Sequence, residues 1–182
     1  DPQLLKGQGA FVDDIPLPGA LHVAFVRSPF ARAHITSIDA AAARAHPGVA
    51  AVYTADDTGI LDIEMPLLIP HPSMTNARTQ RPLARDDVYY VGQTVAMVVA
   101  VDRYTAEDAA MLVDVDYEPL DVEVDLEKAI ADGAPLVHAT HPNNVAAHFV
   151  QVSGDPDAAV AGAEHVTRIR VQVDRSTAAP ME

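Results

Sequence analysis

His138 and His141, in the segment HATHPNN, are the residues whose spacing comes nearest to that of a metal site. On a helix, two histidines three residues apart would present both imidazoles on one face, where a metal ion could bind them. Pro142 and the asparagines after it argue against a helix here. The sequence also lacks an H-E-x-x-H motif and a suitably spaced third ligand. We therefore expect no metal site, and a metal hydrolase that uses this pair is the third of three functional hypotheses.

Two glycine-containing segments invite a search for a phosphate-binding loop. Such a loop needs several glycines whose N–H groups point at one anion, and its dinucleotide version needs a strand, G-x-G-x-x-G and then a helix. Gly92, in YVGQTVAMVVA, stands alone and is followed by a strand-like run, so we expect a turn between two strands. The G-x-G of KGQGAF is followed by Asp13 and Asp14, which would repel a phosphate, so we expect a terminal loop.

Paired carboxylates, which can perform general acid–base catalysis, occur at Asp13–Asp14, Asp56–Asp57 and Asp86–Asp87. That chemistry needs two carboxyl groups in one cleft, in environments that push their pKa values apart. Adjacent residues on exposed turns point away from each other, so we expect turn and capping roles. Ser28 has no G-x-S-x-G elbow around it, and Arg27 is expected to form a structural ion pair with a neighbouring carboxylate. We therefore assign no catalytic, cofactor-binding or metal-binding residue.

The composition limits the partners and the compartment. Twenty-six acidic against twelve basic residues give a formal net charge of −14, which disfavours nucleic acid as a partner. Without cysteine the chain can hold no thiolate zinc site and no cysteine-ligated iron–sulfur cluster, so any such centre must sit on another polypeptide. No run approaches the roughly 18 apolar residues of a membrane span, and the first residues lack the order of a signal peptide, which favours the cytoplasm. The missing initiator methionine and the abrupt end at STAAPME indicate a piece of a longer protein.

Alternation and apolar runs predict strands with short helices between them. Leu21–Val26 and the segment AHITSI are expected to be strands, followed by a short helix that Asp39 caps and Pro47–Gly48 stops. The segment GVAAVYTADD returns to strand. The near-continuous apolar run Thr94–Val101 is expected to be the central strand, buried on both faces. The proline-rich residues 59–85 predict an extended loop, and DDVYYVG after them a short strand.

The second half of the sequence continues this pattern. Thr105, with Asp108 three residues on, is expected to cap a helix, and LVDVDYEPL then alternates apolar and acidic residues as a half-buried strand does. Two more helices are expected, one capped by Asp125 and ended at Gly133, the other capped by Asp155. A last strand is expected in VTRIRVQVDR. Three histidines in or beside predicted strands are interpreted as structural: His22, His34 and His165.

Four segments, in a fixed order, carry a family resemblance: LLKGQGAFVDDIPLPGALHVAFVRSPFARAHITSID, HPGVAAVYTADD, RPLARDDVYYVGQTVAMVVA and AEDAAMLVDVDYEPLDV. Together they closely resemble the N-terminal part of the large subunit of molybdenum hydroxylases, the family of xanthine dehydrogenase, aldehyde oxidase and aerobic carbon monoxide dehydrogenase. The resemblance is dense over residues 1–137 and thinner beyond them. The ending DRSTAAPME resembles the family's transition into the first cofactor-binding domain.

The resemblance implies an α/β fold of mixed α+β character. Residues 1–137 would form an a/b hammerhead domain with a mixed sheet and short helices. Residues 138–182 would be a linker and the first elements of the molybdenum-cofactor-binding domain, cut short. The expected partners are the molybdenum-cofactor-binding domains of the same chain, together with iron–sulfur and FAD subunits or domains.

The family's chemistry would belong to the whole enzyme, which hydroxylates or oxidises a purine, an aldehyde or carbon monoxide. The resemblance implies molybdopterin, 2Fe-2S clusters and FAD for that enzyme, and no cofactor in this chain. The family's general-base glutamate and its pterin-binding glycine and glutamine segments have no counterparts here. Our first hypothesis is therefore a structural N-terminal portion of a molybdenum hydroxylase large subunit that is inactive alone. The second is a stand-alone binding module with the hammerhead fold and no catalysis.

Overall fold

The computed structural model describes residues 2–173 except 58, 60–62, 68–69 and 77. Its internal contacts divide the chain into two compact units, of which the larger is Ala20–Phe149. The smaller unit combines Asp1–Gly19 with Val150–Glu182 and contains three short helical segments: α1 (Pro2–Leu5), the 3-10 helix η1 (Val12–Asp14) and α5 (Pro156–Ala161). The domain boundary expected between residues 137 and 138 stays a prediction.

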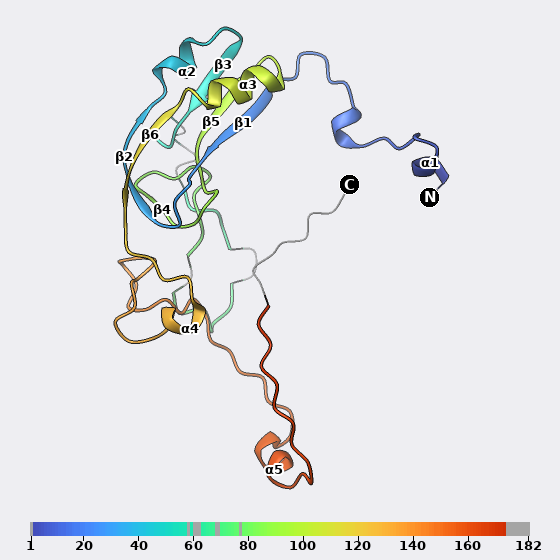
Figure 1. Cartoon of the computed structure of the whole chain (residues 1–182), viewed down its shortest axis with the longest axis vertical. Coiled ribbons are helices and arrows are strands. Elements are labelled where there is room, and N and C mark those ends of the chain that lie inside the picture. Colours follow the sequence, from blue (N-terminus) through green and yellow to red (C-terminus); the bar gives the residue numbers. More distant parts are fainter. Residues whose placement is uncertain (1, 58, 60–62, 68–69, 77, 174–182) are drawn as a thin grey trace. The chain divides into compact units, whose positions relative to one another are not determined.

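The first sheet of the larger unit has three antiparallel strands in the order β1 (His22–Arg27), β5 (Thr94–Ala100) and β3 (Val49–Tyr53). The predicted central position is confirmed, because β5 pairs with a neighbour on each side, but the expected burial on both faces is wrong, because Met97 and Val99 are only partly buried. Four of its seven residues are buried: Val95, Ala96, Val98 and Ala100. Figure 1 shows the helices α2 (Ala41–Ala45) and α3 (Arg103–Ala110) lying along this sheet.

The second sheet has the order β4 (Asp87–Val88), β2 (Ala33–Asp39) and β6 (Asp114–Pro119), again antiparallel throughout. The helix α4 (Leu126–Ala129) follows β6. The α/β class is confirmed, with the expected strands arranged in two small antiparallel sheets. In the described parts of residues 59–85 no α-helix or sheet strand forms, Gly59 alone has a 3-10 conformation, and the one pairing is a single bridge from Met74 to Ala147, in agreement with the expected loop.

Two apolar clusters stabilise the larger unit. The first joins the helices to the first sheet, with Ala43 of α2 and Ala109 of α3 against Ala96 and Val98 of β5. The second lies where the two sheets meet and consists of Ala33, Ile35, Ala84, Val88 and Val95. Small side chains such as alanine let the helix backbones approach the sheet closely, which agrees with the low aromatic content of the sequence.

The predicted N-cap residue is confirmed for two helices and wrong for two others. Asp125 caps α4 and Asp155 caps α5, as expected. The predicted cap of α3 is wrong, because the N-cap is Asp102, three residues before Thr105, and its side chain accepts a hydrogen bond from the Thr105 N–H at 2.8 Å. The cap predicted for α2 is also one residue off, because the N-cap is Ala40 and Asp39 ends β2, where it accepts from the Ala41 N–H at 2.9 Å.

Two expected ends differ from the structure. Helix α4 ends at Ala129, and Gly133, with φ of +81°, lies in the turn after it. The strand expected in VTRIRVQVDR is wrong for Val166–Val173, which carry no strand pairing and are exposed. The last two residues of that segment, and STAAPME after them, lie outside the described residues. Among the helices that the structure describes, none is long and apolar enough to cross a membrane.

Candidate functional site

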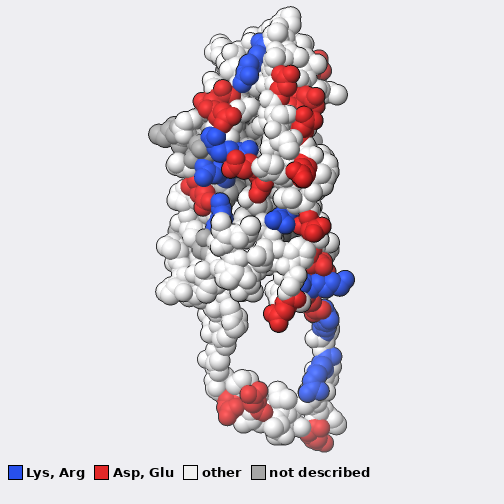
Figure 2. Space-filling model, turned by 90° about the vertical axis from the view of Figure 1, so that its left-hand side faces the viewer, with Lys and Arg blue, Asp and Glu red and all other residues white. Residues whose placement is uncertain are grey.

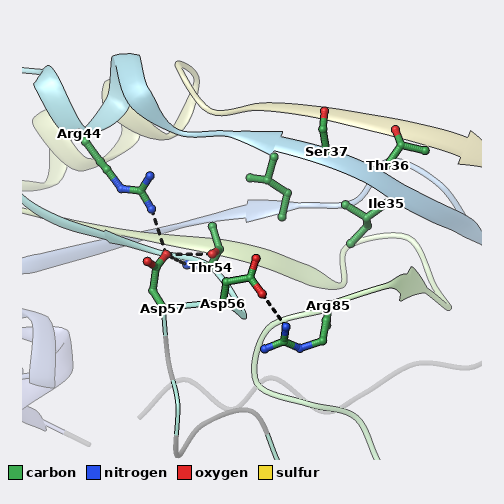
Figure 3. A pocket seen from close by; sticks show the side chains of 9 residues that line it. Ile35, Thr36, Ser37, Arg44, Thr54, Asp56, Asp57 and Arg85 are labelled. Atoms are coloured by element: carbon green, nitrogen blue, oxygen red, sulfur yellow. Dashed lines mark hydrogen bonds and ion pairs between the residues drawn. The ribbon is translucent and has the colours of Figure 1, made fainter.

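A polar hollow of about 390 Å³ lies between the two sheets of the larger unit (Figure 3). Strand β2 forms one wall with residues 35–38. Arg44 of α2 lies across the opening, and Arg85 comes from the segment before β4. The loop after β3 supplies the remaining polar groups: Thr54, Asp56 and Asp57.

Asp57 is the most heavily bonded acid of this hollow. Its Oδ2 accepts hydrogen bonds from the Thr54 N–H at 2.9 Å and the Thr54 hydroxyl at 2.8 Å. The Arg44 Nη2 donates a third bond at 3.0 Å. The backbone hydrogen bond from Thr54, followed by the bond from its hydroxyl and the charge of Arg44, holds the pKa of Asp57 below its ordinary value. The carboxylate is thus ionised at neutral pH, and its Oδ2 already accepts three hydrogen bonds.

Arg85 is held in a similar way by the neighbouring acid. Its Nη1 lies 2.5 Å from Asp56 Oδ1, and its Nη2 donates to the Ala55 carbonyl at 2.8 Å. The hollow therefore contains two cation–carboxylate pairs, Arg44 with Asp57 and Arg85 with Asp56. Each guanidinium charge is offset by an acid within hydrogen-bond distance, so the hollow offers little attraction to an anionic ligand. These pairs join α2, the loop after β3 and the segment before β4.

The histidine pair examined for metal binding lies in a second, smaller hollow of about 190 Å³. The ring of His138 is 5.4 Å from that of His141 and 4.4 Å from that of Tyr89, centroid to centroid. Burial lowers the pKa of His138, and the positive charge of Arg78 adds to the effect. Among the described residues, no group of three or more His, Cys, Asp or Glu could hold a metal ion. The pair thus packs as rings, and its lack of metal stays a prediction.

The remaining candidates have local structural partners. The buried Ser28 hydroxyl donates to the Phe30 carbonyl at 3.1 Å and accepts from the Phe30 N–H at 3.0 Å. The partners of Arg27 that the structure describes are the Gly92 carbonyl, at 2.9 Å, and the ring of Phe25, rather than the predicted carboxylate. Gly92 itself forms the predicted turn, with φ of +89° and its N–H bonded to the Ser28 carbonyl at 2.8 Å.

In two of the paired-acid segments, Asp13–Asp14 and Asp86–Asp87, the second carboxylate contacts another group. Asp14 accepts from the Phe11 N–H at 3.1 Å, as a capping residue does. Asp87 Oδ1 lies 2.9 Å from His34 Nδ1, across the pairing of β2 with β4. This contact raises the pKa of His34 and supports a structural role for it. His165 Nε2 lies 3.7 Å from Glu164 Oε1, and both side chains are exposed.

The charged side chains form no separate basic patch on the face drawn in Figure 2, where Lys and Arg lie beside Asp and Glu in the upper part of the view.

Three residues of the larger hollow were not among the candidates that the sequence indicated: Arg44, Arg85 and Thr54. Thr54 and Asp57 do carry a local signal, since a side-chain acceptor three residues from a backbone donor is a common turn pattern. The two arginines carry none, because their acids lie 13 and 29 residues away.

Proteins with similar sequences match most of this chain. Residues 6–121 match the family described as aldehyde oxidase and xanthine dehydrogenase, a/b hammerhead domain. The nicotine 6-hydroxylase large subunit of Paenarthrobacter nicotinovorans is 41% identical over 186 residues, which covers 100% of this chain and 22% of the relative. The carbon monoxide dehydrogenase large chain of Afipia carboxidovorans is 48% identical over 138 residues, 75% of this chain and 16% of the relative.

Solved structures agree in fold. A Cu,Mo-CO dehydrogenase matches 74% of this chain with a TM-score of 0.64 and 47% identity, over 16% of its own length. The quinoline 2-oxidoreductase of Pseudomonas putida 86 matches 80% of this chain with a TM-score of 0.71 and 39% identity, over 18% of its own length. The chain therefore spans about a fifth of the length of these proteins.

Proposed function

Since the chain belongs to the a/b hammerhead family of aldehyde oxidase and xanthine dehydrogenase, we propose that it is the hammerhead portion of the large subunit of a molybdenum-dependent oxidoreductase. The observation that carries this proposal is the match of residues 6–121 to the hammerhead family. The identity of 48% to a carbon monoxide dehydrogenase large chain supports it.

The role proposed for this chain within such an enzyme is architectural. The larger of the two hollows described above is occupied by the pairs of Arg44 with Asp57 and Arg85 with Asp56, which position chain segments rather than a reactive group. The Thr54 hydroxyl donates to the Asp57 oxygen that also accepts from the Thr54 N–H and from Arg44, so this bond holds the turn together. We assign no catalytic residue to this chain, and the reaction is proposed to occur on other parts of the enzyme.

The larger hollow does not fit the molybdenum cofactor. When bound, that cofactor supplies the redox chemistry by which a substrate carbon is oxidised. Its pterin carries a phosphate, which would need uncommitted donors, whereas both guanidinium groups of the larger hollow already contact carboxylates. The cofactor is thus proposed to bind to other domains of the same large subunit.

The proposed partners follow from the relatives and from the composition. Two relatives are named as components of larger assemblies, a nicotine 6-hydroxylase large subunit and a 6-hydroxypseudooxynicotine dehydrogenase complex subunit gamma. A chain without cysteine cannot ligate an iron–sulfur cluster through thiolates. We propose that 2Fe-2S clusters and FAD are held by other subunits or domains. The cytoplasmic location stays a prediction from the sequence.

A chimera tests this function. In the carbon monoxide dehydrogenase large chain of Afipia carboxidovorans, the matching segment is replaced by the hammerhead residues of this chain. The chimeric large chain should assemble, bind molybdenum at the level of its parent and oxidise carbon monoxide, because the exchanged segment supplies fold and no ligand. The isolated 182-residue chain, as the control, should bind no molybdenum.

Two results would contradict the proposed function. A chimeric large chain that fails to assemble would contradict the proposal and favour a stand-alone binding module. Stoichiometric molybdenum in the isolated chain would contradict the architectural role.

A further inference from the structure

One face of the first sheet is apolar on all three strands. Cross-strand partners in a sheet point to the same side, and the register pairs Phe25 with Met97 and Met97 with Tyr53. Two residues along β5, Val99 pairs with a neighbour on each side in the same way. We call this surface the outer face, and it consists of Val23, Phe25, Ala51, Tyr53, Met97 and Val99.

The opposite face of this sheet is covered. Ala96 and Val98 of β5, which point the other way, pack against Ala43 of α2 and Ala109 of α3. These alanines are fully buried. The outer face receives no such layer: Val23 is 48% exposed, Phe25 43% and Tyr53 37%. A sheet normally buries an apolar face, so the outer face lacks its second layer.

The rest of the chain shows how its solvent-facing strands are built. Along β6, Asp114, Asp116 and Glu118 alternate with apolar residues and take the outward positions. Acidic side chains are abundant in this chain, with 26 Asp and Glu. The outer face contains none of them. Arg27, at the end of β1, is the nearest charge that the register places beside it, and its guanidinium lies over the ring of Phe25 at 5.4 Å.

We propose that the outer face docks against another domain of the same large subunit and is buried there by an apolar surface. The inference rests on the proposed function. In the relatives, the segment that matches this chain makes up only 16 to 23% of the whole polypeptide, so most of the polypeptide available to cover the sheet belongs to other domains. A face without charge is typical of permanent contacts, whereas transient partners more often meet polar surfaces.

Two glutamate variants of the chimeric large chain test the inference. Phe25→Glu and Tyr53→Glu each place a charge on the outer face, from different strands, and each should lower the yield of assembled, soluble chimera at least tenfold. The matched control is Tyr104→Glu. Tyr104 is 80% exposed and lies on α3, the helix that covers the opposite face. Its variant should assemble within twofold of the unmodified chimera.

Folding is monitored separately in the isolated 182-residue chain. Because the two side chains are about two-fifths exposed, both variants should fold and melt cooperatively, which separates a docking defect from misfolding. The inference is overturned if the variant chimeras assemble as well as the control. It is also overturned if the isolated chain dimerises at micromolar concentration and Phe25→Glu makes it monomeric, since a second copy would then occupy the face. Failure of the unmodified chimera to assemble overturns the proposed function itself, and this inference with it.

Discussion

Asp57 Oδ2 accepts hydrogen bonds from both the backbone N–H and the hydroxyl of Thr54, at 2.9 and 2.8 Å. Thr54 is buried, so its N–H depends on this acceptor, whereas the bond from Arg44 lies in a more exposed position. These two hydrogen bonds hold the turn after β3, which lines the larger hollow (Figure 3).

Asp57→Ala should therefore lower the free energy of unfolding by about 1.5 kcal/mol at pH 7, because it leaves a buried donor without its acceptor. The adjacent Asp56→Ala is the control and should cost less than about 0.5 kcal/mol, since Asp56 is 82% exposed and its ion pair is screened. The pKa of Asp57 is lowered in the fold, so its contribution is complete above the ordinary value of 3.8 and is lost as pH falls through the folded pKa. Urea titrations at pH 7 and pH 3 measure both effects, and equal losses in the two variants would contradict the assignment.

Asp102 is the second prediction, because it is the cap of α3 in place of Thr105. Asp102→Ala should lower the melting temperature by several degrees, and Asp102→Asn by less, since asparagine retains the acceptor for the Thr105 N–H. Asp108→Ala serves as the control, because Asp108 is exposed and was expected to complete a capping box at Thr105. If Asp108→Ala is the more harmful of the two alanine variants, the helix begins where the sequence first indicated.

Alanine substitutions at Gly48 and Gly92 distinguish the stability cost of backbone strain from that of side-chain crowding. Both have positive φ, +86° and +89°. A Cβ on Gly48 would lie 3.0 Å from Val101 Cγ2 and 3.1 Å from Thr105 Cγ2, whereas a Cβ on Gly92 would meet nothing within 4 Å. Gly92→Ala should thus cost about 1 kcal/mol from strain alone, and Gly48→Ala roughly twice as much. Thermal unfolding of the two variants checks this order, and equal costs would show that the contacts at Gly48 relax freely.

The contact of His34 with Asp87 predicts a pH dependence of the opposite sign to that of Asp57. The side-chain hydrogen bond that His34 donates to Asp87 is the main cause that raises the pKa of His34 above 6.5. The pair therefore stabilises the fold fully below pH 6.5, and this contribution is lost as pH rises through the folded pKa. Asp87→Asn should return the pKa of His34 toward its ordinary value in an NMR titration. An unchanged titration curve would mean that the 2.9 Å contact does not persist in solution.

The sequence predicted the elements whose signals are local. The run at β5 is apolar because the strand is central, and the caps Asp125 and Asp155 each bond an N–H two or three residues away. Val166–Val173 alternate with one slip in phase and yet carry no strand pairing. A strand requires a hydrogen-bonding neighbour, and alternation indicates only which side of a strand would be buried.

The larger hollow could not be predicted for the same reason. Its two ion pairs join residues that come together only after α2, β3 and β4 have taken their places, and a single sequence carries no trace of which arginine meets which acid. The identity of the cap at α3 also depended on context. Asp102 and Thr105 are both good caps, and the end of β5 at Ala100 decides between them because the chain enters the helix directly after it.

His138 provides the last prediction, which also tests the metal hypothesis. His138 Nδ1 and His141 Nε2 are buried without a hydrogen-bond partner among the described residues, so protonation of His138 would add a buried charge. Its pKa is lowered mainly by burial, and the protein should lose stability as pH falls below 6.5, where the unfolded chain binds the proton more tightly. His138→Phe retains a ring against Tyr89 and should reduce this loss between pH 8 and pH 5. A zinc titration of the unmodified chain and of the double variant His138→Ala/His141→Ala should give the same weak binding. Stoichiometric binding that disappears in the double variant would instead establish a metal site at this pair.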